Sequence, residues 1–344
     1  MKITTVGIDL AKNIFQVHGA DREGTPVLRR KLRRSGMLKF FEALEPCLIG
    51  LEACGGAHHW ARELIARGHD VRLMPPQYVK PYVKRHKNDV TDAEAICEAV
   101  TRPTMRFVPV KTVDQQSVLM LHRSRDLLVR QRTMLTNAMR GHFSELGIVV
   151  GQGRRNIGVL VELVRSMPEE HVPAIAREVL ETLILQLEAL QTRITDLEAT
   201  LKSWHRSNPA SQRLASIPGV GPITATAIVA TVGDARQFKS GREFAAWIGL
   251  VPRQHSSGGK ERLGGITKRG DAYIRRLLIH GARTVLRWRR QRKDTASAWL
   301  QGLLERRPVN IVTVAVANKS ARIAWALLNR GETYKAPAAP SVAS

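Results

Sequence analysis

The chain has 344 residues, enough for two or three domains with hydrophobic cores. It carries 54 Lys and Arg against 30 Asp and Glu, a formal net charge of +24, and 43% of its residues are apolar. This balance excludes a disordered chain and predicts a polyanionic partner, for which nucleic acid fits better than a membrane surface. No apolar run reaches the length of a membrane span, and the N-terminus lacks a signal-peptide core. We therefore expect a cytoplasmic protein.

The first hundred residues predict an α/β domain, because β-branched runs alternate with helical patterns. A hairpin is expected from residues 3–8 and 14–18, and Gly24 follows as a turn. Further elements are expected as a strand at 27–32, a helix at 37–44, a strand at 47–51, a helix at 58–67 and a strand at 70–74. The cysteines Cys47, Cys54 and Cys97 have apolar surroundings and no CxxC spacing, so we expect reduced core residues rather than disulfides or a zinc site.

Four acidic residues of this part are candidates for a metal site. Asp9 and Glu52 each stand at the carboxyl end of an expected strand, where ligands of open α/β sheets collect. Asp89 and Asp92 are three residues apart, which places both on one face of a helix. Carboxylates grouped in this way bind one or two Mg²⁺ or Mn²⁺ ions, which can polarise a phosphodiester. The alternatives are a turn aspartate, an N-cap at Glu52, and aspartates that answer the helix dipole.

Cations precede the two aspartates. Lys84, Arg85 and Lys87 interleave with Tyr78 and Tyr82, a pattern suited to tracking a nucleic-acid backbone, although a solvated loop has the same composition.

Two long helices are expected next. One covers 112–146 and is rich in arginine; glycines at 147–158 end it. In the second, apolar residues alternate at spacings of three and four, which is a heptad seam: Leu180, Leu183, Leu187, Leu190, Ile194, Leu197, Leu201 and Trp204. The partner is another subunit or the preceding long helix, and of the two we favour an oligomer.

Residues 214–225 resemble a helix-hairpin-helix element, in which a glycine turn exposes backbone N–H groups to a DNA phosphate. Gly219 and Gly221 are the glycines concerned. The alternative is a tight turn between two packed helices.

A strongly basic region follows at 241–293, with 14 Lys and Arg against 3 Asp and Glu. Inside it, residues 249–260 predict a flexible glycine-serine loop between helical segments. Ser256 and Ser257 are either linker or, on a mobile basic loop, a nucleophile for a phosphodiester. The cations expected to face phosphate are Arg253, Lys260, Arg262, Lys268 and Arg269, with Arg275 and Arg276 on a helix at 271–290. Residues 331–344 predict a disordered tail.

Several motifs in this order resemble the DEDD-type insertion-sequence transposases, a family of bridge-RNA-guided serine recombinases. The segments that carry the resemblance are residues 7–12, 51–55 and 87–93 for the acidic motifs, and 216–221 and 249–258 for the C-terminal motifs. The resemblance covers the whole chain except the tail.

The resemblance implies four parts. They are a RuvC-like metal-binding domain of RNase H fold at 1–110, long coiled-coil helices for dimerisation at 111–207, a mainly helical transposase domain at 208–330, and the tail at 331–344. It also implies that Asp9, Glu52, Asp89 and Asp92 bind Mg²⁺, and that Ser257, which precedes a glycine, attacks DNA to form a phosphoserine link.

The implied partners are donor and target DNA, a structured guide RNA and further copies of the chain. The family works as a tetramer in which the acidic site of one subunit meets the serine of another, in the bacterial cytoplasm at the nucleoid. Two alternatives stay open: a metal-dependent junction-resolving nuclease that uses water, and a non-catalytic nucleic-acid-binding scaffold.

Overall fold

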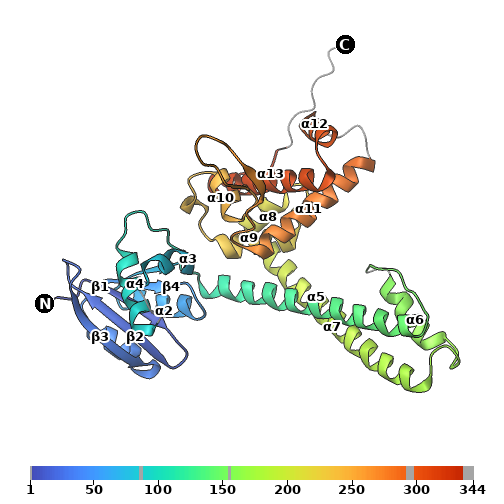
Figure 1. Ribbon diagram of the computed structural model, residues 1–344, viewed down its shortest axis with the longest axis horizontal. Helices are drawn as coiled ribbons and strands as arrows, with labels where there is room; N and C mark the ends of the chain where they lie inside the picture. The colour runs from blue at the N-terminus through green and yellow to red at the C-terminus, as the bar shows by residue number, and fades with distance from the viewer. Residues whose placement is uncertain (1, 85–87, 154–155, 292–297, 336–344) are drawn as a thin grey trace, which may run out of the picture. The chain divides into compact units, whose positions relative to one another are not determined.

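The computed structural model describes residues 2–84, 88–153, 156–291 and 298–335 (Figure 1). Contacts divide the chain into two compact units, Met1–Val113 and Asp114–Ser344. The expected parts at 111–207 and 208–330 thus lie together, from Asp114 onward, in the second unit.

A five-stranded mixed sheet forms the centre of the first unit. Its strands are β1 (Thr5–Leu10), β2 (Ile14–Ala20), β3 (Pro26–Arg33), β4 (Leu48–Glu52) and β5 (Asp70–Met74). They lie in the order β3-β2-β1-β4-β5, with antiparallel pairing among β1, β2 and β3 and parallel pairing among β1, β4 and β5. The predicted α/β organisation is confirmed, and each strand begins and ends within two residues of its predicted position.

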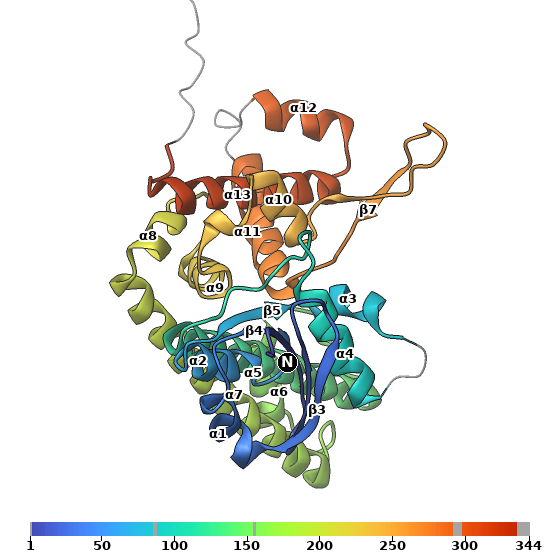
Figure 2. The same ribbon diagram turned by 90° about the vertical axis from the view of Figure 1, so that its left-hand side faces the viewer.

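Helices cover both faces of this sheet (Figure 2). On one face Ile8, Phe15 and Leu51 form an apolar core with Trp60 of α2. On the other face Ile96 of α4 packs into a second cluster around β5. The helices of this unit are α1 (Met37–Glu42), α2 (Ala57–Ile65), α3 (Pro76–Val79) and α4 (Asp89–Val100), with 3₁₀ turns at η1 (Arg34–Gly36) and η2 (Lys80–Tyr82).

Two glycines of the sheet let α4 approach its backbone. A Cβ placed on Gly7 of β1 would lie 2.2 Å from the carbonyl oxygen of Ala93 and 2.3 Å from the backbone nitrogen of Cys97. A Cβ on Gly50 of β4 would lie 2.9 Å from the side chain of Val100. Glycine at position 7 is therefore a condition for the helix to sit where it does, because backbone atoms cannot move aside as a flexible side chain can.

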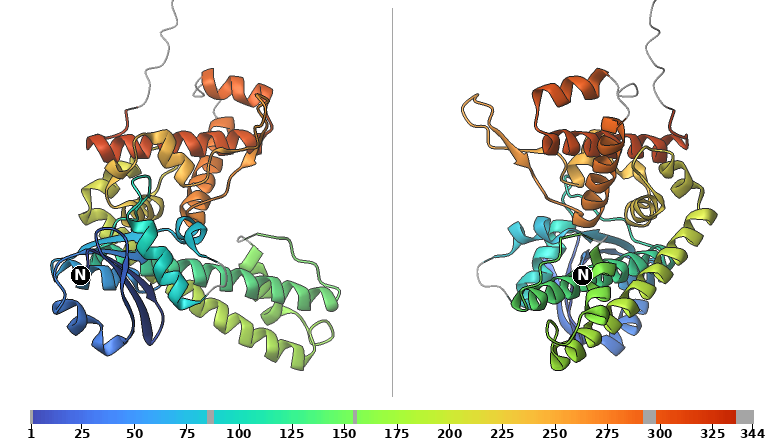
Figure 3. Two further views of the ribbon diagram at one scale, coloured as in Figure 1. Left: turned by 60° about the vertical axis from the view of Figure 1, so that its left-hand side comes forward. Right: turned by 90° about the vertical axis from the view of Figure 1, so that its right-hand side faces the viewer.

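Two long helices of the second unit, α5 (Val113–Glu145) and α7 (Ala174–Ser207), run antiparallel beside each other (Figure 3). Arg125 pairs with Glu198 at 2.6 Å, and Arg132 donates to the Oε1 of Gln191 at 2.8 Å. The apolar seam predicted on α7 is buried or half-buried along its length, and its first turns pack against α5 and α6 (Ile157–Ser166). The seam is therefore filled within the chain, which removes its support for an oligomer.

The rest of the second unit is a helical body around one core. Residues of α13, among them Val312 and Ala321, pack there with Phe244 of α10 and Leu278 of α11. The elements are α8 (Pro209–Ala215), α9 (Pro222–Val232), η4 (Ala235–Gln237), α10 (Gly241–Trp247), β6 (Pro252–Gln254), β7 (Leu263–Ile266), α11 (Ala272–Gln291), α12 (Ala298–Arg306) and α13 (Val309–Arg330).

Among the described helices, α13 alone is long and apolar enough to cross a membrane. This test rests on length and composition, which core helices also satisfy. Since one side of α13 is buried in the helical body, it is a core helix of that body.

Part of the expected tail is ordered. The backbone N–H of Tyr334 donates to the hydroxyl of Ser216 at 2.9 Å, and the Tyr334 side chain packs against the helical core. The prediction of a disordered tail is thus wrong for residues 331–335, while residues 336–344 lie outside the described residues.

Replacing Gly7 by alanine is expected to lower the free energy of unfolding by about 2–3 kcal/mol, because the added methyl group overlaps the backbone of α4. Urea denaturation followed by circular dichroism measures this. Gly55→Ala is the matched control, since its Cβ would meet no atom within 4 Å. Equal stabilities of the two variants would show that the helix does not depend on this contact.

Candidate active site

Asp9 and Glu52 stand at the carboxyl ends of the two central parallel strands. The register pairs Ile8 of β1 with Leu51 of β4, so Asp9 and Glu52 are the next neighbours across the two strands. Because side chains alternate along a strand, both point to the sheet face of Gly7 and Gly50, the face that α4 covers. The structure thus brings these two predicted residues together.

The pKa of the Cys54 thiol is affected by both carboxylates. Partial desolvation raises the pKa of Cys54, and the negative charges of Glu52 and Asp9 raise it further. Cys54 is exposed, so its predicted core position is wrong, whereas Cys47 and Cys97 are buried and reduced as predicted. Both carboxylates are thus close enough to Cys54 to affect its thiol.

The direction of α4 points Asp89 and Asp92 toward the same edge. The thiol of Cys97 donates to the carbonyl oxygen of Thr5, and the backbone of Ala93 lies against Gly7. The residues of α4 nearer its N-terminus therefore lie beside the residues of β1 nearer Asp9. Asp89 and Asp92 are one turn before Ala93 and Ile96, on the stripe of α4 that faces the sheet.

Asp89 and Asp92 both lie in the first turn of α4, as the helix-dipole alternative requires, but neither of them caps the helix. The Oδ1 of Asn88 accepts from the backbone N–H groups of Val90 and Thr91, both at 3.0 Å. The hydroxyl of Thr91 in turn accepts from the backbone N–H of Asn88 at 3.2 Å. This capping box satisfies the helix start without either aspartate. The capping alternative for Glu52 is likewise not realised, since Gly56 is the N-cap of α2.

The chemistry of this edge suits a hard divalent cation. Carboxylate oxygens are the donors that such ions prefer, and in a chain of net charge +24 two of them, from Asp9 and Glu52, are neighbours here. Within residues 2–84, 88–153, 156–291 and 298–335, however, no three Asp, Glu, His or Cys side chains are close enough to hold a metal ion. Asp9 and Glu52 are neighbours at this edge, whereas Asp89 and Asp92 are not close enough to form one metal-binding group with them.

Ser257 lies at the tip of a β-hairpin. Strands β6 and β7 pair antiparallel, and the backbone N–H of Lys260 donates to the carbonyl oxygen of Ser257 at 3.1 Å. Gly258 and Gly259 have φ values of 56° and 75°, the positive values that both central residues of a type I′ turn require. The predicted flexible loop between helical segments is therefore wrong, because the two glycines form an ordered turn in a hairpin that projects from the helical body (Figure 3).

The two adjacent serines differ in their surroundings. The hydroxyl of Ser256 accepts from the backbone N–H of Arg262 at 3.4 Å, and this contact lies between the two arms of the hairpin. The Ser257 hydroxyl is exposed and makes no side-chain hydrogen bond to any described residue. Both serines are exposed, and Ser257 is the one whose hydroxyl makes no such contact between the hairpin arms.

The expected phosphate-facing cations fall into two groups. Those along the hairpin and just beyond it are exposed: Arg253, Lys260, Arg262, Lys268 and Arg269. Others have protein partners: Lys84 bonds to Glu94 at 2.6 Å, and Arg275 donates to the carbonyl oxygens of Ile248 and Arg269 at the hairpin base. Arg276 pairs with Asp126 and covers the Tyr273 ring. Arg85 and Lys87 lie outside the described residues.

The glycine turn between α8 and α9 is packed against α11. Gly219 has φ +83°, and a Cβ on it would lie 2.6 Å from the carbonyl oxygen of Gly281. This contact favours the tight-turn alternative for Gly219. Gly221, the N-cap of α9, has no atom within 4 Å of a built Cβ and stays accessible for a phosphate.

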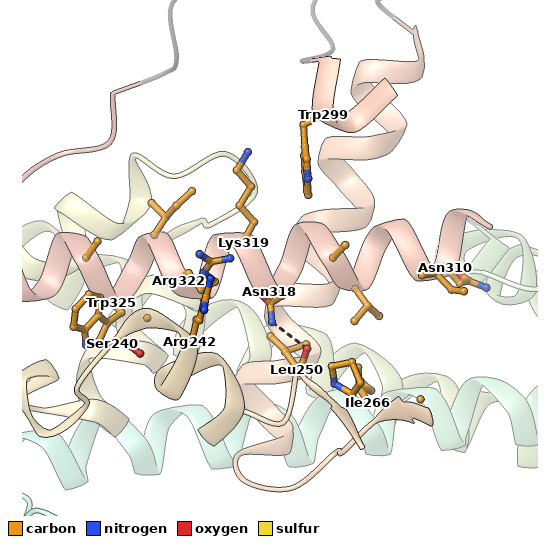
Figure 4. A pocket seen from close by; sticks show the side chains of 18 of the residues that line it. Ser240, Arg242, Leu250, Ile266, Trp299, Asn310, Asn318, Lys319, Arg322 and Trp325 are labelled. Atoms are coloured by element: carbon orange, nitrogen blue, oxygen red, sulfur yellow. Dashed lines mark hydrogen bonds between the residues drawn. The ribbon is translucent and has the colours of Figure 1, made fainter. Parts of the chain in front are cut away.

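A groove at the base of the hairpin was not predicted from the sequence (Figure 4). It has a volume of about 1270 Å³ and runs along α13, with Arg242 of α10 and Arg322 beside it. The ammonium group of Lys319 lies 4.3 Å from the ring centroid of Trp299. The apolar periodicity of 309–330 could have indicated a helix here, but the groove requires α10, α12 and the hairpin to be in place.

Comparisons with known proteins agree with the positions of these motifs. A model described as the IS116/IS110/IS902 family of transposases matches residues 211–297, and a DEDD transposase model matches residues 6–148. Both the acidic residues and the serine hairpin fall inside these matches. The mixed sheet followed by helices is consistent with a DEDD nuclease-like fold.

Several relatives are similar over nearly their whole length. A probable family 20 transposase of Pseudomonas aeruginosa is 53% identical over 97% of this chain and 99% of its own. The transposase for insertion sequence element IS1111A of Coxiella burnetii is 44% identical over 97% and 92%. The transposase for IS1328 of Yersinia enterocolitica is 42% identical over 96% and 98%.

Alkylation of Cys54 by iodoacetamide at about pH 8 is expected to be faster in Glu52→Gln than in the unsubstituted protein. Removing one neighbouring negative charge lowers the thiol pKa and raises the thiolate fraction. Peptide mass spectrometry measures the rate. Cys47 and Cys97 serve as internal references, because burial raises the pKa of each to about 11.

Glu45→Gln is the control for this measurement, since that carboxylate pairs with Lys2 at the surface. A Cys54 rate in Glu52→Gln no higher than in Glu45→Gln would contradict the convergence of carboxylates at this edge.

Proposed function

Because the chain belongs to the IS116/IS110/IS902 family of insertion-sequence transposases, we propose that its acidic edge and its serine hairpin together carry out DNA strand cleavage and exchange. The observation that carries this proposal is the pairing of Asp9 with Glu52 at the ends of β1 and β4, within the segment matched by the DEDD transposase model. The α4 helix then supplies Asp89 and Asp92 from the same face.

The DEDD family implies a divalent cation, and we assign Mg²⁺ or Mn²⁺ to Asp9, Glu52, Asp89 and Asp92. When bound, the cation offsets the negative charge of a phosphodiester and polarises it. The residues of the chain contribute position: β1 and β4 fix two carboxylates rigidly, and the capping box holds the other two in the first helical turn. An ordered helix start matters because a misplaced ligand weakens a cation site.

Ser257 is the proposed nucleophile. Its hydroxyl oxygen attacks the phosphorus of a DNA phosphodiester, and the bond from phosphorus to the leaving deoxyribose oxygen breaks. That oxygen takes up a proton, while the serine hydroxyl gives one up. One phosphodiester replaces another, so the hydroxyl of a second DNA end can reverse the step and rejoin the strand. The exposed tip position and the five exposed cations on and beside the hairpin support this assignment.

The active site is proposed to be shared between subunits of a dimer or tetramer, as the family resemblance implies. The heptad seam of α7 does not support this, since it is filled within the chain. Another feature does: Met120, Leu127 and Met134 of α5 are spaced by seven residues and are 65%, 48% and 69% exposed. An apolar stripe at heptad spacing on the outer side of a long helix suits a helix of another subunit.

The proposed partners are donor and target DNA and a structured guide RNA, which would place the protein at the bacterial nucleoid. The cations of the hairpin contact no described acidic side chain and form no recognisable base-reading motif. Such a surface binds the sugar-phosphate backbone of either nucleic acid, and base pairing with RNA would then supply sequence choice.

Strand exchange by Ser257→Ala, assayed with protein, RNA, both DNAs and Mg²⁺, is expected to fall by about 10³-fold or more, because the nucleophilic oxygen is removed. Ser256→Ala is the matched control and should retain most activity. Loss of activity only in Ser256→Ala would move the nucleophile by one residue. Cleavage retained by Ser257→Ala but lost by Asp9→Asn would instead support a metal-dependent nuclease that uses water.

A further inference from the structure

A buried polar side chain lies directly beside Asp9. The register of β1 and β2 places Gln16 opposite Asp9. Gln16 is only 5% exposed, and its Oε1 atom has no hydrogen-bond partner among the described residues. Cross-strand neighbours have Cβ atoms about 4.5–5.5 Å apart, so the amide group is within reach of the carboxylate.

The Gln16 side chain points to the same face of the sheet as those of Asp9 and Glu52, the face that α4 covers. Its neighbours Phe15 and Val17 fill the core on the side of α1 and α2. Alternation along the strand turns Gln16 to the other face, where α4 lies across β1, β2 and β4. The amide is thus enclosed between the sheet and the helix that carries Asp89 and Asp92.

The unsatisfied oxygen has a cost. A buried acceptor without a partner destabilises a fold, because no hydrogen bond offsets its loss of hydration. An apolar side chain of similar volume, such as methionine, would avoid this cost. The neighbouring group is a carboxylate, which also accepts rather than donates. The amide oxygen of Gln16 would be satisfied by a cation bound at Asp9, or by a water molecule that the cation orients.

We propose that Gln16 is a further residue of the cation site, and that its amide oxygen binds the divalent cation held by Asp9 and Glu52 directly or through one of the cation's water molecules. The inference rests on the proposed function of this edge. It adds a neutral oxygen donor from β2, so three adjacent strands, β2, β1 and β4, contribute to one site.

The same strand supplies a matched control. His18 lies two residues further from this edge, opposite Gly7, and is 3% exposed with its Nδ1 likewise without a partner. The charged groups near it are Glu94, Arg29 and Lys84 rather than Asp9 or Glu52. A substitution at His18 therefore reproduces the burial and the face of Gln16 but not its place at the cation site.

The test is titration of Mn²⁺ into the full-length protein, with free Mn²⁺ measured by electron paramagnetic resonance. Gln16→Met is expected to weaken binding about 10-fold. Its melting temperature in EDTA should equal or exceed that of the unsubstituted protein, because the unsatisfied oxygen is gone. Gln16→Glu is expected to bind Mn²⁺ more tightly, and His18→Leu to bind it with unchanged affinity.

Outcomes separate this inference from the function on which it rests. If Asp9→Asn loses Mn²⁺ binding while Gln16→Met and Gln16→Glu both bind like the unsubstituted protein, the cation site stands and the role of Gln16 is refuted. If Asp9→Asn also binds normally, or the unsubstituted protein binds no Mn²⁺, the proposed cation site and the inference fall together. Should Gln16→Met fail to fold, Gln16→Glu decides by itself.

Discussion

The close contact of α4 with two glycines of the central strands, through its backbone at Gly7 and its side chains at Gly50, determines the geometry of the first unit. It allows the helix to lie closer to β1 than any side chain at position 7 would permit. It also fixes the direction of α4, and with it the side of the sheet on which Asp89 and Asp92 lie. Under the proposed function this packing requirement also serves catalysis, because the contact that buries Ile96 directs the first turn of α4 toward the end of β1.

Charge is distributed to match this arrangement. Most of the chain is basic, as a protein that handles polyanions requires, yet two carboxylates, those of Asp9 and Glu52, are neighbours at one edge of the sheet. A phosphodiester cannot approach that edge unless a cation offsets the repulsion. The serine hairpin has the opposite character, with cations along both arms and a tip set by two glycines. Under the proposed function each part supplies half of the chemistry of strand transfer, the acidic edge the cation and the hairpin the nucleophile.

Sequence patterns predicted the first unit well, since the β-branched runs that form its strands are local features. They located Asp9 and Glu52 because strand ends are visible in a sequence. They failed where the outcome depends on tertiary partners. The pattern of Ser256, Ser257, Gly258 and Gly259 predicts a flexible loop, but the pairing of β6 with β7 makes these residues the end of a hairpin. Arg275 was predicted to face phosphate, but its guanidinium group donates to two backbone carbonyl oxygens instead. The position of Gln16 became visible only through its register with Asp9.

The central claim is that DNA becomes joined to Ser257 while a cation is held at the acidic edge. The most direct measurement is mass spectrometry of the protein after incubation with DNA, RNA and Mg²⁺, followed by nuclease and protease digestion. The account predicts a nucleotide on the peptide that contains Ser257, and no such adduct with Asp9→Asn. Recombined product with no adduct on Ser256 or Ser257 would contradict it.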